Sequence, residues 1–221
     1  ARGRVMRILD NVDPVPGENL TIHIDSRLQR VAYKAFKGER GALVAIDVNT
    51  GGILAMVSAP SYDPNLFVSG ISQAEYSGLL DSPGRPLFDR SIRGQYPPGS
   101  TIKPLFGLIG LASNSISIDY TIDDPGYFIM EDIERPWRDH NSKSGGHGKG
   151  VGLARAIIES CDVFFYKMSI KIGIDLLSNY SKKFGLGQVT GIYLHGEQPG
   201  IMPSRIWTKS ALVESWFNGD T

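Results

Sequence analysis

The sequence predicts an α+β domain whose sheet is incomplete. Two apolar segments at residues 41–47 and 53–58 are joined by an Asn-Thr-Gly-Gly turn, which is typical of a hairpin. Residues 20–24 alternate like a third strand, whereas helical spacing of apolar residues dominates after residue 105. Three strands leave apolar sheet positions without a partner, so we expect further strands on the C-terminal side that this chain lacks.

The composition is that of a folded protein with no strongly charged surface. Apolar residues make up 41% of the 221 residues, charged residues make up 21%, and the formal net charge is zero. A zero net charge argues against a nucleic-acid partner, and no apolar run reaches the ~18 residues of a membrane-spanning helix. The chain starts at Ala1-Arg2-Gly3-Arg4 with neither a signal peptide nor an initiating Met, so we expect a piece of a longer protein.

Residues 1–19 are expected to be the tail of an upstream domain followed by a linker. They are polar and contain Pro14, Pro16 and Gly17, which interrupt regular structure. Residues 20–221 are then predicted to belong to one further domain. After the strand pattern at 20–24, Asp25 can cap a helix that extends to residue 36, because apolar residues recur there three and four positions apart.

The rest of the chain is predicted to be mostly helical. Both hairpin segments are almost continuously apolar, which predicts a sheet covered on both faces. Pro104 stands in the first turn of an apolar helix, where its missing N–H costs least. Residues 66–95 are expected to be a loop with one short helix, and the Gly- and Pro-rich residues 115–150 are expected to be irregular. The predicted helices after the hairpin are 72–80, 105–112, 153–159, 162–172, 174–184 and 207–217.

A serine and a lysine stand three residues apart directly after a Pro-Pro-Gly turn. Residues three apart share one face of a helix, which would place the Lys103 amine beside the Ser100 hydroxyl at a helix start. A serine hydroxyl needs a base, and lysine can be that base when burial or a second cation favours its neutral form. Free N–H groups at a helix start also stabilise an oxyanion. The pair predicts acyl transfer, although the same spacing occurs on solvated helix faces.

The segment Ser160-Cys161-Asp162 lies between two predicted helices and can offer a second hydroxyl and a polar side chain to the same cleft. Serine acyl-transferases that react with penicillin combine Ser-x-x-Lys with Ser-Asp-Asn and Lys-Thr-Gly. The first two of these have counterparts in this chain. The second segment therefore favours the interpretation of Ser100 and Lys103 as a catalytic pair.

Cys161 and the preceding loop contain residues of the types that bind zinc in proteins. The loop offers five potential ligands: Asp123, Asp124, Asp139, His140 and His147. One thiolate, one imidazole and two carboxylates make a tetrahedral zinc set. The alternative is a group of surface loop residues beside a small buried thiol, because no short metal-binding motif is present.

Five segments contain the most distinctive motifs of the chain: residues 41–47, 55–65, 96–104, 164–166 and 184–187. Together they resemble the class B penicillin-binding proteins. The Ser-x-Asp form of residues 160–162, residues 62–68 and the closing Gly219-Asp220-Thr221 resemble the penicillin-binding protein 2 subgroup, and the resemblance covers residues 20–221. It implies the penicillin-binding and serine β-lactamase-like transpeptidase fold, an antiparallel sheet sandwiched by helices. The Lys-Thr-Gly motif of the family does not occur in this chain, so we expect a truncated and catalytically incomplete piece.

The resemblance implies a peptidoglycan D,D-transpeptidase that forms 4→3 crosslinks during cell elongation and rod-shape maintenance. Ser100 would attack the D-Ala-D-Ala carbonyl of a stem peptide with Lys103 as its base, and β-lactams would acylate the same serine. Ser160 would relay a proton toward the leaving amine, and Asp162 would make a polar contact in the cleft. No cofactor is implied for catalysis.

The resemblance also implies a structural zinc ion held by Asp124, Asp139, His147 and Cys161. The implied partners are stem peptides, β-lactams and, through a missing N-terminal part, a membrane glycosyltransferase and elongation-complex proteins, with no nucleic acid. The implied location is the bacterial inner membrane, reached by a removed N-terminal anchor, with the catalytic domain in the periplasm.

Two other functions would use the same nucleophile pair. A serine β-lactamase would need a residue that activates water for deacylation, and the sequence shows no obvious one. A non-catalytic β-lactam sensor would be acylated without turning over a peptide substrate. The lifetime of the acyl adduct separates the lactamase from the transpeptidase.

Overall fold

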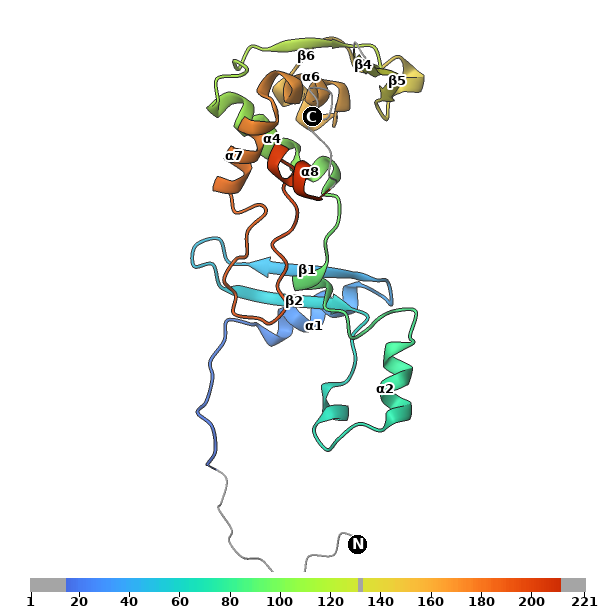
Figure 1. Ribbon diagram of the computed structural model, residues 1–221, viewed down its shortest axis with the longest axis vertical. Helices are drawn as coiled ribbons and strands as arrows, with labels where there is room; N and C mark the ends of the chain where they lie inside the picture. Colours follow the sequence, from blue (N-terminus) through green and yellow to red (C-terminus); the bar gives the residue numbers. More distant parts are fainter. Residues whose placement is uncertain (1–14, 131–132, 212–221) are drawn as a thin grey trace, which may run out of the picture. The chain divides into compact units, whose positions relative to one another are not determined.

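The computed structural model describes residues 15–130 and 133–211, and the chain divides into two compact units (Figure 1). We call Ala1–Ser91 unit 1 and Ile92–Thr221 unit 2. The tail expected at residues 1–14 lies outside the described residues. The division at residue 19 stays a prediction, and each unit is described by itself.

Unit 1 is built on the predicted hairpin. β1 (Gly41–Ile46) pairs antiparallel with β2 (Ile53–Ala59). The helix α1 (Ser26–Ala35) begins as predicted, because the Asp25 carboxylate accepts hydrogen bonds from the first N–H groups of the helix. It packs against the hairpin over a small core made of Ala32, Ala55 and Val57.

The two edges of this strand pair differ. The Gln29 side chain donates to Met56 O at 2.6 Å and accepts from Met56 N at 2.8 Å, so its amide closes the outer edge of β2. No described strand lies along the outer edge of β1, in agreement with an incomplete sheet. Val44 and Ile46 of β1 are 41% and 55% exposed. Within unit 1 the helix α1 packs on one face of the strand pair, and coverage of the other face stays a prediction.

The prediction of a strand at residues 20–24 is wrong, because the structure has no strand there. Leu20 and Ile22 are exposed, and the segment has no strand partner within the described residues. Only at Asp25 does a backbone N–H reach the hairpin, at Leu54 O. Alternation of side chains cannot form a strand where no neighbouring strand accepts its hydrogen bonds.

The segment after the hairpin contains the predicted short helix. It is α2 (Gln73–Leu80), and Ser72 and Glu75 form a reciprocal capping box at its start. Two further short elements were not predicted, because each is a single turn with too few residues to show a period. They are η1 (Pro64–Phe67) and α3 (Arg90–Arg93).

Unit 2 has a helical core (Figure 1). Five of its buried apolar residues lie on one helix, α6 (Asp162–Ile172), including Phe164 and Met168, both 0% exposed. Gly107 permits close approach of a second helix, since a Cβ there would lie 2.8 Å from the Leu153 side chain. The helices are α4 (Lys103–Ala112), α5 (Leu153–Ile158), α6 (Asp162–Ile172), α7 (Ile174–Lys183) and α8 (Arg205–Ala211).

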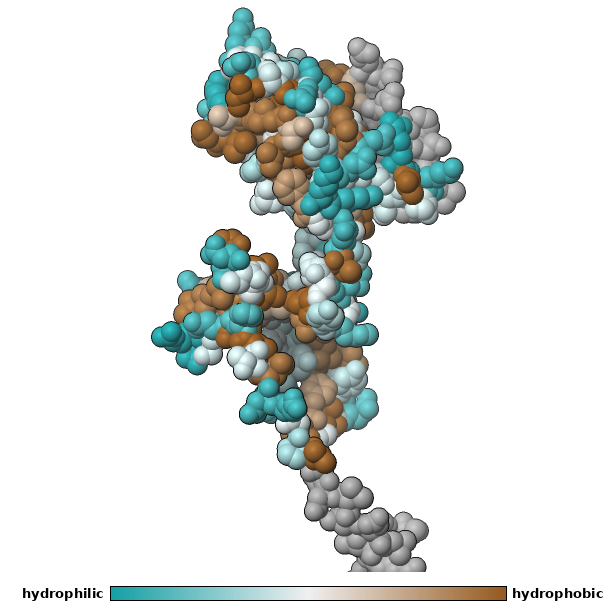
Figure 2. Space-filling model, turned by 90° about the vertical axis from the view of Figure 1, so that its left-hand side faces the viewer, coloured by the Kyte–Doolittle hydropathy of each residue, from teal (hydrophilic) through white to brown (hydrophobic). Residues whose placement is uncertain are grey.

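The described ends of these helices match the predicted segments to within two residues. In α7, Leu176 is 40% exposed, whereas the adjacent Leu177 is buried. The last helix starts two residues before the predicted start at 207, and the predicted residues 212–217 lie outside the described part. Figure 2 shows hydrophobic side chains at the surface of unit 2 on the side where α7 lies in Figure 1.

The expectation of irregular structure at residues 115–150 is wrong. β3 (Thr121–Asp124) pairs antiparallel with β6 (Gly148–Gly152), and β4 (Tyr127–Met130) pairs antiparallel with β5 (Ile133–Arg138). The last strand of the set reads Gly-Lys-Gly-Val-Gly, so its composition is that of a turn. Pairing with a distant strand, and not local propensity, decides its conformation.

Candidate active site

Ser100 lies in a tight turn that precedes α4. The turn η2 (Gly99–Ile102) is a 3-10 helix, and the Thr101 hydroxyl closes it by donating to Pro98 O at 2.6 Å. Gly99 has φ +57°, a conformation that favours glycine. The Ser100 side chain is exposed. The turn therefore presents the hydroxyl to solvent just before the α-helix begins at Lys103.

Lys103 is buried and binds the second segment of the site. Its Nζ donates to Ser160 O at 2.7 Å, Ser160 Oγ at 3.0 Å and Asp162 Oδ1 at 2.5 Å. The Lys103 side chain is 9% exposed and the Asp162 side chain 27%. The Lys103 backbone N–H donates to Ser100 O, but within the described residues no hydrogen bond joins the Ser100 hydroxyl to the Lys103 amine. Because an ammonium has three donors, this arrangement uses all of them on the segment between α5 and α6.

The segment Ser160–Asp162 faces two ways. Ser160 has φ +54°, which reverses the chain after α5. Cys161 then caps α6, since its Sγ accepts from Phe164 N at 3.3 Å. The backbone N–H of Asp162 donates to Asp139 Oδ2 at 2.6 Å. As a result, Ser160 and Asp162 point toward Lys103 while the thiol points into the protein.

The thiol meets three other potential metal ligands in the interior. The four residues are all buried, and one ligand atom of each lies within 4.8 Å of the others: Asp124, Asp139, His147 and Cys161. Asp124 Oδ2 lies 2.7 Å from His147 Nδ1 and 3.3 Å from Cys161 Sγ. His147 Nδ1 lies 3.7 Å from Asp139 Oδ2. We call this set the buried donor cluster.

Burial decides the electrostatics of the cluster. Burial raises the pKa of the Cys161 thiol to about 12, and the adjacent carboxylates raise it as well. Burial also opposes the charged form of Asp124, but hydrogen bonds from His147 and from Gly126 N–H hold the pKa of that carboxyl below its usual value. Two carboxylates and a thiol thus lie beside one imidazole, an excess of acidic groups that a divalent cation would compensate.

The cluster fits a zinc ion in donor type and in spacing. Ligand atoms around a tetrahedral zinc ion lie roughly 3.3–3.8 Å apart, given bond lengths of ~2.0–2.3 Å. The contacts of Asp124 with Cys161 and of His147 with Asp139 already have such separations. The four donors are buried together on three different segments of unit 2, so the alternative of surface loop residues does not describe them.

Two features that support the cluster were missed at the level of sequence. A Cβ on Gly146 would lie 2.2 Å from Gly126 N and 2.5 Å from Asp124 O, so only glycine fits where the loop approaches the cluster. The Arg155 guanidinium donates to His147 O at 2.9 Å and holds that residue from outside. The Gly-Gly-His-Gly run was the available signal for the first feature, and nothing local indicated the second.

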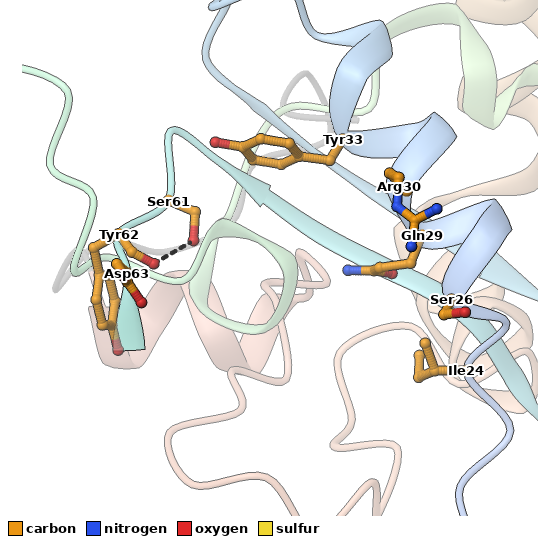
Figure 3. Close-up of a pocket in the computed structure, with 8 residues that line it drawn as sticks. All are labelled: Ile24, Ser26, Gln29, Arg30, Tyr33, Ser61, Tyr62 and Asp63. Carbon is orange, nitrogen blue, oxygen red and sulfur yellow. Dashed lines mark hydrogen bonds between the residues drawn. The ribbon is translucent and has the colours of Figure 1, made fainter. Parts of the chain in front are cut away.

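A surface hollow of about 640 Å³ lies in unit 1, apart from these residues. Figure 3 shows Arg30 and Tyr33 from α1 on one side and Tyr62 and Asp63 after β2 on the other. Tyr62 belongs to the predicted family motif. The hollow lies in unit 1, whereas Lys103, Ser160 and Asp162 belong to unit 2.

Comparison with known proteins gives consistent matches over most of the chain. A model of the penicillin-binding protein transpeptidase domain matches residues 41–217. The chain is 43% identical over 220 residues to the peptidoglycan D,D-transpeptidase MrdA of Escherichia coli, and the match covers 100% of this chain and 34% of the relative. The chain thus spans about a third of the length of that curated relative.

Two solved structures are similar in fold and sequence. Penicillin-binding protein 2 of Pseudomonas aeruginosa, in complex with WCK 5153, has a TM-score of 0.86 and 45% identity, covering 95% of this chain and 47% of that one. Penicillin-binding protein 2 of Helicobacter pylori, in its complex with MreC, has a TM-score of 0.82 and 38% identity, covering 89% of this chain and 36% of that one. The predicted transpeptidase fold and the predicted resemblance are therefore confirmed.

Proposed function

Because this chain belongs to the penicillin-binding protein transpeptidase family, we propose that it is the N-terminal part of the transpeptidase domain of a peptidoglycan D,D-transpeptidase. The observation that supports this proposal is the contact of Lys103 with Ser160 and Asp162, made across two distant segments. A solvated lysine on a helix face would have no such contacts. The motif-bearing segments are adjacent where the proposed chemistry requires them.

Ser100 is the proposed nucleophile, and it attacks the D-Ala-D-Ala carbonyl of a stem peptide. Its hydroxyl proton passes to neutral Lys103, a covalent bond forms between Ser100 Oγ and the carbonyl carbon, and the peptide C–N bond breaks. The leaving D-Ala amine takes up a proton through Ser160, whose Oγ lies 3.0 Å from Lys103 Nζ. An amine from a neighbouring strand then attacks the acyl-enzyme, which forms the crosslink and releases Ser100.

The hydrogen bonds of Lys103 set a condition on this sequence of steps. A neutral amine has two protons and one lone pair, so it cannot donate to all three of its present acceptors. The contact with Ser160 Oγ can reverse its direction and let the serine hydroxyl donate to the amine. Asp162 Oδ1 lies 2.5 Å from Lys103 Nζ and compensates the positive charge that Lys103 acquires on proton transfer.

Labelling of the full-length protein tests the nucleophile. We expect a labelled penicillin to form a covalent adduct that maps by peptide sequencing to Ser100, and Ser100→Ala to abolish it. Thr101→Ala is the matched control, because it removes an adjacent hydroxyl of the same turn and leaves Ser100 in place. Label on a residue other than Ser100 would refute the assignment.

The kinetics of the adduct separate the alternatives. A long-lived acyl-enzyme together with crosslinking of a donor peptide supports the transpeptidase. Rapid hydrolysis of the adduct would indicate a β-lactamase. A long-lived adduct without any turnover of a donor peptide would indicate a sensor.

We also propose that the buried donor cluster holds a structural zinc ion through Asp124, Asp139, His147 and Cys161. When bound, the ion supplies charge compensation and a fixed link between the loop and α6. Asp139 then transmits this order to the site, because its carboxylate holds the N–H of Asp162. Elemental analysis of the full-length protein should give one zinc, which Cys161→Ser removes. A zinc-free unmutated protein would overturn the proposal.

The proposed setting is the periplasmic side of the inner membrane. None of the described helices could span a membrane. The solved Helicobacter pylori relative forms a complex with MreC, and we propose a MreC-type partner and a membrane glycosyltransferase for the full-length protein during cell elongation. Loss of rod shape on depletion, with co-purification of these partners, is the expected result.

A further inference from the structure

A second group of potential ligands lies on the outer side of the buried donor cluster. Ligand atoms of Asp139, His140 and Asp162 all lie within 4.8 Å of one another. The His140 side chain is 58% exposed and the Asp162 side chain 27%, whereas the Asp139 carboxylate is wholly buried. The group therefore opens to solvent on one side and rests on a rigid acidic residue on the other.

Asp139 connects the two groups through its separate oxygens. Oδ1 lies 3.0 Å from His140 Nδ1 on the outside, and Oδ2 lies 3.7 Å from His147 Nδ1 on the inside. Two backbone N–H groups hold the carboxylate, since Asn141 N donates to Oδ1 at 2.9 Å and Asp162 N donates to Oδ2 at 2.6 Å. The carboxylate is thus fixed in an orientation that can bridge a buried ion and an exposed one.

We propose that Asp139, His140 and Asp162 form an outer site for a divalent cation of the zinc class. One imidazole and two carboxylates, with room for water, are a ligand set of open zinc sites, and the imidazole favours zinc over magnesium or calcium. Two ligands of one zinc ion lie at most ~4.2 Å apart. Small rotations of His140 and Asp162, which are the exposed members, close the group around an ion.

The outer ion competes with Lys103 for Asp162. In the structure Asp162 Oδ1 lies 2.5 Å from Lys103 Nζ. A cation that binds this carboxylate withdraws the negative charge that would compensate Lys103 once Lys103 has accepted the Ser100 proton. Occupation of the outer site therefore inhibits acylation, a consequence that rests on the proposed function, whereas the binding of the ion does not.

Metal titration of the full-length protein tests the site. With the buried site filled, we expect Zn²⁺ to bind as a further, weaker equivalent in calorimetry, and Co²⁺ at this site to give visible absorption bands. His140→Gln should lose this equivalent and keep the first. His195→Gln is the matched control, since it removes an exposed imidazole outside both groups and should keep both equivalents.

The outcomes are distinct. A second equivalent that survives His140→Gln unchanged overturns the outer site, and so does an unmutated protein that binds one equivalent under excess Zn²⁺. In penicillin acylation, excess Zn²⁺ should slow the unmutated protein and His195→Gln several-fold and leave His140→Gln unaffected. Equal inhibition of His140→Gln overturns the competition for Asp162. If Ser100 is not acylated at all, the proposed function fails while the binding experiment still decides the site.

Discussion

The two sides of the Ser160–Asp162 segment are built differently. On one side, Lys103 reaches hydroxyl and carboxylate groups that are partly open to solvent. On the other side, Cys161 meets carboxylates and an imidazole with almost no exposure. The tripeptide thus lies between the partly exposed contacts with Lys103 and the buried donor cluster. The difference suggests that the first side performs chemistry and the second maintains the position of the first.

Lys103→Met is expected to have the largest effect on the acylation rate. It should change only the side of the tripeptide that contacts Lys103, which we call the open side, and not the side with the buried donor cluster, which we call the closed side. Removal of the proposed base should slow penicillin acylation of the full-length protein by about 10³-fold, within the range of general acid–base catalysis. Methionine keeps the length of the side chain, so zinc content should not change. Lys171→Met, in α6, is the control, and it should be acylated by penicillin at the normal rate. Loss of zinc in Lys103→Met would show that the two sides are not separable.

Gly146→Ala tests the closed side. The added Cβ would collide with the backbone of Gly126 and Asp124, so the loop must move away from the cluster. We expect zinc affinity to fall by about 10- to 100-fold, as for other disturbances of groups that support metal ligands. Competition with a zinc chelator measures this change.

Gly145→Ala is the matched control for the same loop. Both glycines have positive φ, but a Cβ on Gly145 meets no atom within 4 Å. It should therefore show the cost of backbone strain without the collision. Equal zinc affinities for the two variants would contradict the role of close approach at Gly146.

Asp139→Asn should affect both sides. The amide can still accept the Asp162 N–H, while the carboxylate ligand proposed for zinc is lost. We expect zinc affinity to fall by about tenfold or more, because a neutral amide oxygen is a weaker ligand than a carboxylate, and we expect a smaller drop in acylation rate. Asp123→Asn is the control, because Asp123 is exposed and contacts Gly150 N outside the cluster. An acylation rate unchanged by Asp139→Asn, despite lost zinc, would remove the proposed link between the sides.

Gln29→Ala is expected to have the smallest effect and should leave both sides intact. It removes the amide that closes the outer edge of β2, at a cost of about 1 kcal/mol. Amide hydrogen exchange at Met56 should accelerate, while exchange in α6 should not. Arg30→Ala, at the neighbouring exposed position of the same helix, should change neither. Slow exchange at Met56 in Gln29→Ala would show that another group protects the edge.

Sequence-based predictions succeeded where neighbouring residues determine an element, and failed where pairing with a distant segment determines it. The cap at Asp25 and the hairpin turn are local, and each marked its element within one or two residues. The strands β3 and β6 were missed, because they pair with each other across a long intervening segment. The strand expected at residues 20–24 failed for the opposite reason, since a local pattern had no distant partner.

By itself, the sequence determined the chemical inventory of the site: a nucleophile with a candidate base, a second hydroxyl, and one thiol with carboxylates and imidazoles nearby in the chain. The tertiary structure decided how this inventory is divided. It directed Lys103 toward Ser160 and Asp162, turned Cys161 inward, and placed His140 outside while His147 is buried. The physical reason is that residue type sets what a group can do, whereas burial and the distance to partners from other segments set which of those things it does.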